Sequence, residues 1–393
     1  MTAPDPNLVP FASSAAAGGP EFVETPVAYD ALVLASFGGP EGQDEVIPFL
    51  RNVTRGRGIP DERLEEVAHH YRHFGGVSPI NAQNRALKAA LEAEIAGRGL
   101  DLPVYWGNRN SEPYLDEAFT AAADDGHATL LVLATSAYSS YSSDRQYRED
   151  IARAITDAGL EERVTADKVR LYFDHPGFVQ PFQEGVDAAV VAFLEQGIPA
   201  SDIHVLFSTH SIPTADAERS GPRTVEWGEG GAYVAQHRAV AAHIIENLAA
   251  VTGGRTVPWQ LVFQSRSGPP TQPWLEPDIN DVIAELPASG AKAVVIVPLG
   301  FVSDHMEVMW DLDTEAMESA VQAGLLATRT QTPGVHPAFV AGLVDLVIER
   351  LEGTPAADRP HLTDLGPWYD VSRAGDCENV RLGFKPAAAG LVP

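Results

Sequence analysis

Short apolar runs alternate with amphipathic helical stretches along most of the chain. The runs are rich in Val, Leu, Ile and Ala, and continuous apolar strands of this kind are typical of parallel sheets covered on both faces. Helical patterns such as 234–250 lie between the runs and indicate repeated βα units. We predict strands at 31–36, 102–106, 129–134, 169–173, 203–208, 257–263, 293–298 and 326–330.

The predicted strands form two successive sets of four. We therefore expect an α/β fold of two doubly wound lobes, each with a four-stranded parallel sheet flanked by helices, and an active-site cleft between the lobes. The first residues are rich in Pro, Ala, Gly and Ser without periodicity, which is typical of a mobile segment. The expected organisation is a mobile tail at 1–28, a first lobe at 29–180, a second lobe at 181–333, a closing helix at 334–355 and a C-terminal extension at 356–393.

Composition excludes several classes of protein. The chain has 54 Asp and Glu against 27 Lys and Arg. Such a negative field repels phosphate backbones and anionic membrane surfaces, so we expect no nucleic-acid partner. No apolar stretch approaches the roughly 20 residues that cross a bilayer, and we expect a cytoplasmic protein without a transmembrane segment. The single cysteine, Cys377, excludes an internal disulfide and cannot alone hold an iron–sulfur cluster or a thiolate zinc site.

Three carboxylates recur at four-residue intervals after the predicted strand at 293–298: Glu307, Asp311 and Glu315. If this segment is helical, the spacing places the three side chains on one face, where they repel unless a cation lies against them. The pattern favours a divalent metal site. A solvated acidic helix face is the alternative.

His210 follows the predicted strand at 203–208, at the end that faces the ligand crevice in open parallel sheets. A neutral imidazole there can accept a proton or bind a metal, and a hydrogen-bonded structural histidine is the alternative. A basic cluster at Arg51, Arg55 and Arg57 either binds an anionic group or solvates the end of a helix. No Gly-x-Gly-x-x-Gly or P-loop pattern opens either unit, so nothing supports a dinucleotide or nucleoside triphosphate site.

Five motifs stand out along the chain: Ser36-Phe-Gly-Gly-Pro40, Phe74-Gly-Gly-Val-Ser-Pro-Ile80, Ser208-Thr-His-Ser-Ile-Pro213, Phe263-Gln-Ser-Arg266 with Trp274-Leu-Glu-Pro277, and Gly300-Phe-Val-Ser-Asp-His-Met-Glu307. Together they resemble one family, the ferrochelatases, over about residues 29 to 353. The resemblance implies insertion of ferrous iron into a porphyrin between two lobes, and the chain looks most similar to the coproporphyrin III branch of Gram-positive-type bacteria.

The resemblance also implies roles for the residues near the ring centre. His210 and Glu307 match the family's paired His and Glu, which would bind iron, accept pyrrole protons, or do both. Asp311 and Glu315 would lie behind this pair, as further ligands or as a route for iron and protons.

Contacts with the porphyrin are implied for Phe37, Ser78 and Tyr147, and Arg55 would face a propionate. Phe37 stands where the Gram-positive branch has an axial tyrosine, and because a phenyl ring cannot ligate iron, it should act by packing against the macrocycle. This chain has His70 where some relatives carry another arginine, so the propionate contacts should be rearranged.

Many actinobacterial-type relatives hold a [2Fe–2S] cluster with one cysteine after a Ser-rich loop and three near the carboxyl terminus. The apparent counterparts here are Asp144, Ser372, Asp376 and Cys377. A lone thiolate cannot complete a four-cysteine set, so we expect no cluster and no permanent cofactor, with Fe²⁺ as a substrate.

The expected partners are coproporphyrin III and ferrous iron, with downstream enzymes of haem synthesis as further partners. Three alternatives stay open from the sequence. The substrate could be protoporphyrin IX, the protein could be a non-catalytic porphyrin or haem carrier, or it could insert cobalt or nickel into a less oxidised tetrapyrrole.

Overall fold

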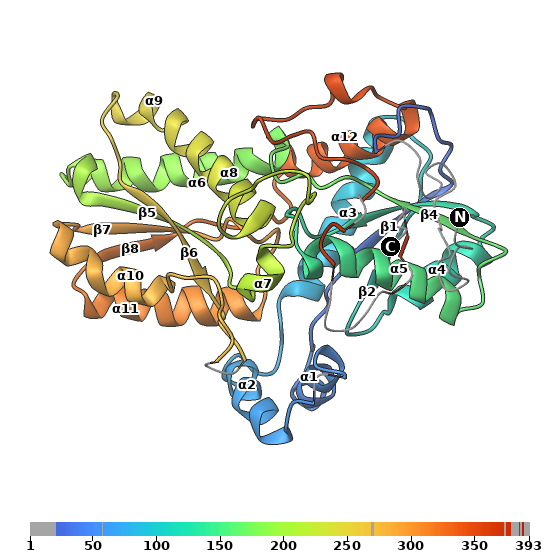
Figure 1. Cartoon of the computed structure of the whole chain (residues 1–393), viewed down its shortest axis with the longest axis horizontal. Helices are drawn as coiled ribbons and strands as arrows, with labels where there is room; N and C mark the ends of the chain where they lie inside the picture. Colours follow the sequence, from blue (N-terminus) through green and yellow to red (C-terminus); the bar gives the residue numbers. More distant parts are fainter. Residues whose placement is uncertain are drawn as a thin grey trace.

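Two parallel four-stranded sheets organise the protein (Figure 1). The computed structural model describes residues 21–56, 58–268, 271–372, 375–378, 385 and 387–388. The first sheet has the order β2-β1-β3-β4, and the second has the equivalent order β6-β5-β7-β8. The expected fold class is therefore confirmed. The strands are β1 (Ala31–Ser36), β2 (Val104–Asn108), β3 (Thr129–Ala134), β4 (Thr165–Lys168), β5 (Ile203–His210), β6 (Trp259–Gln264), β7 (Ala293–Val297) and β8 (Leu326–Arg329).

Helices cover both faces of each sheet. The helices of the first lobe are α1 (Val46–Val53), α2 (Asp61–His73), α3 (Ile80–Gly97), α4 (Leu115–Asp124) and α5 (Gln146–Asp157). Of these, α3, α4 and α5 pack on the sheet, whereas α1 and α2 form a small apolar core of their own. The later helices are α6 (Pro176–Glu195), α7 (Thr214–Ala217), α8 (Gly231–Asn247), α9 (Ala249–Thr252), α10 (Ile279–Glu285), α11 (Met317–Gln322) and α12 (Pro337–Glu352). Two π-helical segments, η2 (Tyr141–Arg145) and η5 (Val308–Ala316), follow β3 and β7, and short 3₁₀ turns are η1 (Gln43–Glu45), η3 (Ala200–Asp202), η4 (Leu286–Ser289) and η6 (Ala356–Asp358).

Alternation along β1 shows how the first sheet is buried on both sides. Ala31, Val33 and Ala35 belong to one apolar cluster together with residues of α4 and α5. Leu32 and Leu34 belong to another, which includes residues of α3 and α12 and continues into the second lobe. Successive strand residues point to opposite faces, and here both faces are apolar, which explains the continuous apolar run.

The strand boundaries depart from the predictions at a few places, and the departures have a physical cause. β2 and β6 begin just after Pro103 and Pro258, later than predicted, because proline has no N–H group for a ladder hydrogen bond. The strand predicted at 169–173 is wrong, since β4 occupies Thr165–Lys168 and the buried apolar residues that follow lie outside the strand, with Val169 still donating to the Val132 carbonyl oxygen at 3.0 Å. The helix predicted at 234–250 is α8, which begins and ends three residues earlier.

α12 connects the two halves of the protein, because it packs against both α6 and α3. On this helix Glu349 pairs with Arg170 at 2.8 Å and Arg350 pairs with Asp167 at 3.0 Å, and all four side chains are buried. This helix, Pro337–Glu352, lies within the stretch 334–355 where a closing helix was predicted. Figure 1 shows it above the junction of the two lobes, with α1 and α2 on the opposite side.

The predicted domain limits stay predictions. The limit between residues 180 and 181 falls within α6, and the predicted tail at 1–28 is described only from Glu21 onward. In that described part, the Val23 N–H donates to a carboxylate oxygen of Asp370 at 2.8 Å, which ties it to the C-terminal extension. Within the described ranges, no helix combines the length and the apolar character that a bilayer crossing needs.

Candidate active site

The carboxyl ends of the second sheet bring the predicted reactive residues together. His210 is the last residue of β5, and Gln264 is the last residue of its neighbour β6. β7 leads through a short loop to Glu307 and then into η5. The carboxyl ends of parallel strands meet at one edge of a sheet, which is the usual ligand-binding edge in open α/β folds.

His210 and Glu307 form a direct pair, in which Nε2 of His210 lies 3.4 Å from Oε1 of Glu307. Nδ1 of His210 donates to the carbonyl oxygen of Ser211, which turns Nε2 toward the carboxylate. The Tyr233 hydroxyl donates to the His210 carbonyl oxygen at 2.8 Å and so supports the end of the strand. The side chains of the pair remain 31% and 47% exposed, so a ligand can reach both.

The two partners shift each other's proton affinity in opposite directions. Burial disfavours the charged form of His210, but the Glu307 carboxylate outweighs burial and raises the pKa of the imidazole to about 9. Burial also disfavours the charged form of Glu307, but His210 outweighs it and lowers the pKa of the carboxyl to about 2. At neutral pH the metal-free pair is therefore an imidazolium–carboxylate ion pair that holds a dissociable proton.

Asp311 lies beside this pair in a different electrostatic state. Its carboxylate accepts a hydrogen bond from the Ser265 hydroxyl, and the Gln264 amide nitrogen lies 3.4 Å from it. Burial and the nearby Glu307 carboxylate raise the pKa of Asp311 to about 7. Asp311 can therefore exchange a proton with its surroundings at neutral pH.

The segment that carries the carboxylate row is a π-helix rather than the α-helix that the spacing suggested. Val308, Leu312 and Ala316 form its buried face against the second sheet. Glu315 is exposed on the following turn, where its negative charge contributes to the raised pKa of Asp311. π-Helical segments are rare and are often found at functional sites.

The first lobe brings the predicted porphyrin-contacting residues close to one buried arginine. The Arg109 guanidinium carbon lies 4.1 Å from the Tyr147 ring centroid and 5.8 Å from the Phe37 ring centroid. Phe37 also packs edge-on against Phe49 at 6.2 Å between centroids. Ser78 is buried, and a side chain added at Gly39 would collide with it, which places Ser78 directly beside the loop that carries Phe37.

The basic cluster is only partly described. Arg51 pairs with Asp61 at 2.9 Å, and both side chains are more than half exposed, so this pair supports the α1–α2 connection at the surface. Arg55 lies exposed just after α1. The prediction for Arg57 lies outside the described residues.

Sequence reasoning missed three supporting residues. Gln264 and Ser265 contact Asp311, and the Gln264 amide also donates to the Glu307 carbonyl oxygen at 3.0 Å. The sequence did contain an indication of Gln264 and Ser265, because both are polar residues at the end of an apolar strand. Tyr233 carried no comparable signal, since it lies within the helix α8 and reaches His210 through the fold.

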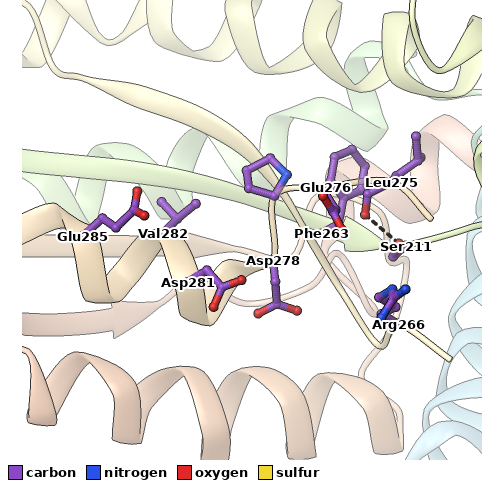
Figure 2. A pocket seen from close by; sticks show the side chains of 10 residues that line it. Ser211, Phe263, Arg266, Leu275, Glu276, Asp278, Asp281, Val282 and Glu285 are labelled. Atoms are coloured by element: carbon purple, nitrogen blue, oxygen red, sulfur yellow. Dashed lines mark hydrogen bonds between the residues drawn. The ribbon is translucent and has the colours of Figure 1, made fainter. Parts of the chain in front are cut away.

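A cavity of about 490 Å³ lies between β6 and α10, and Ser211 is one of the residues that line it (Figure 2). Figure 2 shows Asp278, Asp281 and Glu285 along its α10 side and Arg266 near Ser211. Neither member of the reactive pair lines it. Asp278 accepts a hydrogen bond from the Asn280 N–H at 2.8 Å and so caps α10, which gives part of this acidic lining a structural role.

A second polar cluster lies in the first lobe at the positions where iron–sulfur ligands were considered. We call it the Asp144 cluster, and all of its side chains are buried. Asp144 accepts from Arg148, Lys168 and Ser372, each at 3.1 Å, and the Cys377 thiol donates to Asp376 at 3.1 Å. Its members are Asp144, Arg148, Lys168, Ser372, Asp376 and Cys377.

This donor set does not fit an iron–sulfur cluster. Such a cluster needs thiolate ligands, whereas the four counterpart positions supply two carboxyl groups, one hydroxyl and one thiol. Burial, with the negative charges of Asp376 and Asp144, raises the pKa of Cys377 well above its ordinary value, so the thiol keeps its proton. Arg148 and Lys168 occupy one oxygen of Asp144, and Ser372 occupies the other.

The fold and the pair define a two-lobed α/β protein that offers an imidazole and carboxylates at the ends of parallel strands. Such a site suits binding a divalent cation and moving protons. A family model described as ferrochelatase matches residues 29–351. The chain belongs to the ferrochelatase family, as the motifs implied. It is therefore an enzyme, a lyase whose substrates are ferrous iron and a porphyrin.

Three relatives cover nearly the whole chain, and each is a coproporphyrin III ferrochelatase. The protein from Leifsonia xyli subsp. xyli is 68% identical over 390 residues, which are 97% of this chain and 99% of that protein. The protein from Tropheryma whipplei (strain Twist) is 57% identical over 93% of both chains. The protein from Streptomyces griseus subsp. griseus is 54% identical over 93% of this chain and 97% of its own length.

Proposed function

We propose that this chain inserts Fe²⁺ into coproporphyrin III and yields Fe-coproporphyrin III, or coproheme, in haem biosynthesis. The observation that carries the proposal is the His210–Glu307 pair, which lies at the ligand-binding edge of the second sheet with its two partners 3.4 Å apart. The names of the three relatives support coproporphyrin III as the porphyrin.

His210 and Glu307 would act at the centre of the ring. Iron insertion requires two pyrrole protons to leave while the dication reaches the ring nitrogens. An incoming dication competes with the imidazolium for the Glu307 carboxylate and lowers the pKa of His210. The imidazole then releases its proton and becomes able to accept one from a pyrrole nitrogen.

Asp311 and Glu315 would carry protons and iron between the pair and solvent. The pKa of Asp311, about 7, allows this carboxyl to accept and release a proton at neutral pH. Glu315 is exposed on the next turn of η5, where bulk water can take the proton. A site that holds iron only in transit needs few ligands, since a complete ligand set would retain the metal.

The first lobe would hold the porphyrin. Phe37 offers a partly exposed ring and Arg55 a charge-assisted donor for a propionate, whereas Ser78 and Tyr147, the other contacts that the resemblance implies, are buried in this structure. Four propionates need more cationic donors than two, which makes an exposed arginine valuable in a protein with a formal net charge of −27.

The proposal includes no permanent cofactor, because the Asp144 cluster supplies a donor set unsuited to iron–sulfur chemistry. A cytoplasmic location and contacts with downstream haem-synthesis enzymes stay predictions. Cell fractionation and co-purification would test them.

Anaerobic assays with Fe²⁺ and either coproporphyrin III or protoporphyrin IX test the function directly. Loss of free-porphyrin fluorescence reports insertion, and we expect coproporphyrin III to be the better substrate. Failure to insert iron into either porphyrin would refute the proposed enzymatic activity. His210→Ala and Glu307→Ala should abolish insertion and largely spare porphyrin binding, whereas equal loss of both would favour a porphyrin carrier.

A further inference from the structure

Trp310 is a large aromatic residue of η5 that packs against a helix of the other lobe. Its ring stacks on His70 with 4.1 Å between centroids and 7° between planes. His69, His73 and Phe74 meet the same indole edge-on at 6.1, 5.5 and 6.5 Å. We call these five residues the Trp310 clasp. The clasp joins the helix that carries the carboxylate row to α2 and the residue that follows it.

Ring contacts hold the indole of Trp310 against α2. The Trp310 ring nitrogen is buried and has no hydrogen-bond partner among the residues that the structure describes. Buried indole N–H groups usually have a partner, and leaving one without costs free energy. The stacked and edge-on contacts must therefore offset this cost, which makes the clasp sensitive to the shape of the side chain at residue 310.

The sequence neighbours of the clasp face the reactive pair. Tyr71 follows His70, and Asp311 follows Trp310. Burial, together with the negative charges of Glu307 and Asp311, raises the pKa of the Tyr71 hydroxyl. Tyr71 thus lies within electrostatic reach of both carboxylates, and the clasp places α2 beside the site.

α2 also leads to the predicted porphyrin face of the first lobe. The Tyr71 ring packs against Phe49 with 5.8 Å between centroids, and Phe49 packs against Phe37 at 6.2 Å. α1 and α2 share a small apolar core of their own, in which Phe37 and Tyr71 are partly buried. Aromatic contacts therefore connect Tyr71 with Phe37, and the backbone of α2 connects Tyr71 with the clasp.

Several described contacts hold η5 in place, and the clasp is one of them. Its apolar face is buried in the second lobe, and Arg329 holds Asp313 at 2.8 Å. The clasp is the anchor that spans the two lobes. We propose that Trp310 is a positioning residue, which docks η5 on α2 and so sets the spacing between the carboxylates Glu307 and Asp311 and the porphyrin face at Phe37. This inference rests on the proposed function, because the porphyrin is the ligand whose two sides the clasp would align.

Steady-state kinetics with coproporphyrin III and Fe²⁺ test the role of Trp310. Trp310→Ala should lower kcat/KM for Fe²⁺ about tenfold, because the ring contacts of the clasp are lost and the carboxylates shift from their working positions. Binding of metal-free coproporphyrin, measured by fluorescence, should change less than about twofold, because Phe37, Ser78 and Tyr147 lie in the first lobe. Trp310→Phe should stay within about threefold of the native kcat/KM, since it keeps a ring face.

His70 supplies the partner variants. His70→Ala should also reduce kcat/KM for Fe²⁺, as Trp310→Ala does. His70→Phe keeps a ring that can stack on Trp310 and should retain most of the native kcat/KM. The effects of His70→Ala and Trp310→Ala should not add in the double variant, because each removes the same contact. His127→Ala is the matched control, since it removes an edge-on imidazole contact with Tyr105 at 5.9 Å, in the loop before β3 and away from the carboxyl ends of the strands. It should leave the kinetics unchanged.

Several results would overturn the proposal. Native kcat/KM in Trp310→Ala would do so, as would an equal loss of activity and porphyrin binding, or additive effects in the double variant. If Trp310→Ala does not fold, the His70→Ala and His70→Phe pair decides by the same criteria. Native protein in the same assay separates the two hypotheses, because inactive native protein would refute the proposed function, whereas active native protein with unaffected variants would refute the clasp alone.

Discussion

The equivalent strands β3 and β7 are each followed by a π-helix that carries an aspartate, and the two aspartates have opposite properties. In η2, Asp144 is fully buried between Arg148 and Lys168, which outweigh the effect of burial and hold the pKa of its carboxyl well below the ordinary value. In η5, Asp311 lies beside Glu307, and burial together with that second negative charge raises its pKa to about 7.

The difference shows that neighbours, rather than position in the fold, decide what each aspartate can do. Asp144 is a permanent anion whose oxygens are occupied, so it joins η2, β4 and the C-terminal extension and leaves no room for a ligand. Asp311 changes charge near neutral pH beside an accessible imidazole and carboxylate. One π-helix therefore carries a carboxylate with a fixed charge, and the other carries a carboxyl group that can change its charge.

Removal of Glu307 should have the largest effect on the rate of iron insertion, because it removes the carboxylate that pairs with His210 and raises the pKa of Asp311. We expect Glu307→Ala to lower the rate of iron insertion about 100- to 10,000-fold, through loss of a metal ligand and of the partner that orients His210. Its thermal stability should change little, since the side chain is 47% exposed. Glu318→Ala, at an exposed carboxylate of α11, is the control and should retain native activity. Substantial activity in Glu307→Ala would contradict the assignment.

Removal of Asp144 should instead affect stability. Asp144→Ala removes the buried carboxylate that Arg148 and Lys168 share, and we expect the free energy of unfolding to fall by about 3–5 kcal/mol. Urea denaturation measures this. Asp61→Ala breaks the exposed pair with Arg51 and should leave the denaturation midpoint nearly unchanged, because water and salt screen exposed pairs. Similar losses in the two variants would show that the Asp144 cluster is not the structural element described.

The pH dependence of iron insertion should also distinguish Asp311 from Asp144, with a smaller effect than the two substitutions above. Insertion should rise up to about tenfold per pH unit below the pKa of Asp311, about 7, and level off above it, because the ionised carboxylate is the form that accepts a proton. Asp311→Asn should remove this inflection. Glu307 is one cause of the raised pKa, so the stability profile of Glu307→Ala should shift toward that of an ordinary aspartate.

The sign of the stability change follows from the same shift. The folded-state pKa of Asp311 is raised from the ordinary 3.8, so the folded protein disfavours ionisation relative to the unfolded chain. Its contribution should therefore become less stabilising as pH rises from about 4 to about 7, and stay constant above that range. Urea denaturation across this range, with Asp311→Asn as the reference, measures it. A contribution that grows with pH would contradict the assignment.

Cys377 should give the smallest effect. Its thiol is buried and protonated, so alkylating reagents should react with it only after unfolding. Cys377→Ser should change the free energy of unfolding by about 1 kcal/mol or less, because a hydroxyl can replace the hydrogen bond to Asp376. Protein purified anaerobically should contain no acid-labile sulfide. Stoichiometric sulfide would contradict the structural interpretation of the Asp144 cluster.

Much of the fold could be predicted because its strands are apolar on both faces. β1, β3 and β7 coincide with apolar runs, and their burial leaves little ambiguity in the pattern. β4 could not be predicted this way, since it contains Asp167 and Lys168, which are buried only because they pair with residues far away in the chain. A local pattern does not contain those partners.

The candidate site was predicted unevenly for the same reason. His210 and Glu307 were identified because each follows an apolar strand within a recognisable motif, and the structure places them in contact. Their chemical roles stay predictions. The π-helical form of η5 could not be inferred, because a four-residue spacing suits both α- and π-helical turns. Trp310 was overlooked, since its importance comes from α2, a helix more than two hundred residues earlier.

The position of α12 also has a consequence for synthesis of the protein. Asp167 and Arg170 form ion pairs with Arg350 and Glu349 of this helix, near the end of the chain. While the ribosome is still making the second lobe, the first lobe therefore lacks these two ion pairs and the helix that packs against α3. Its final packing must wait until residue 352 has left the ribosomal tunnel, so the nascent chain depends on late closure by a segment that a premature stop would remove.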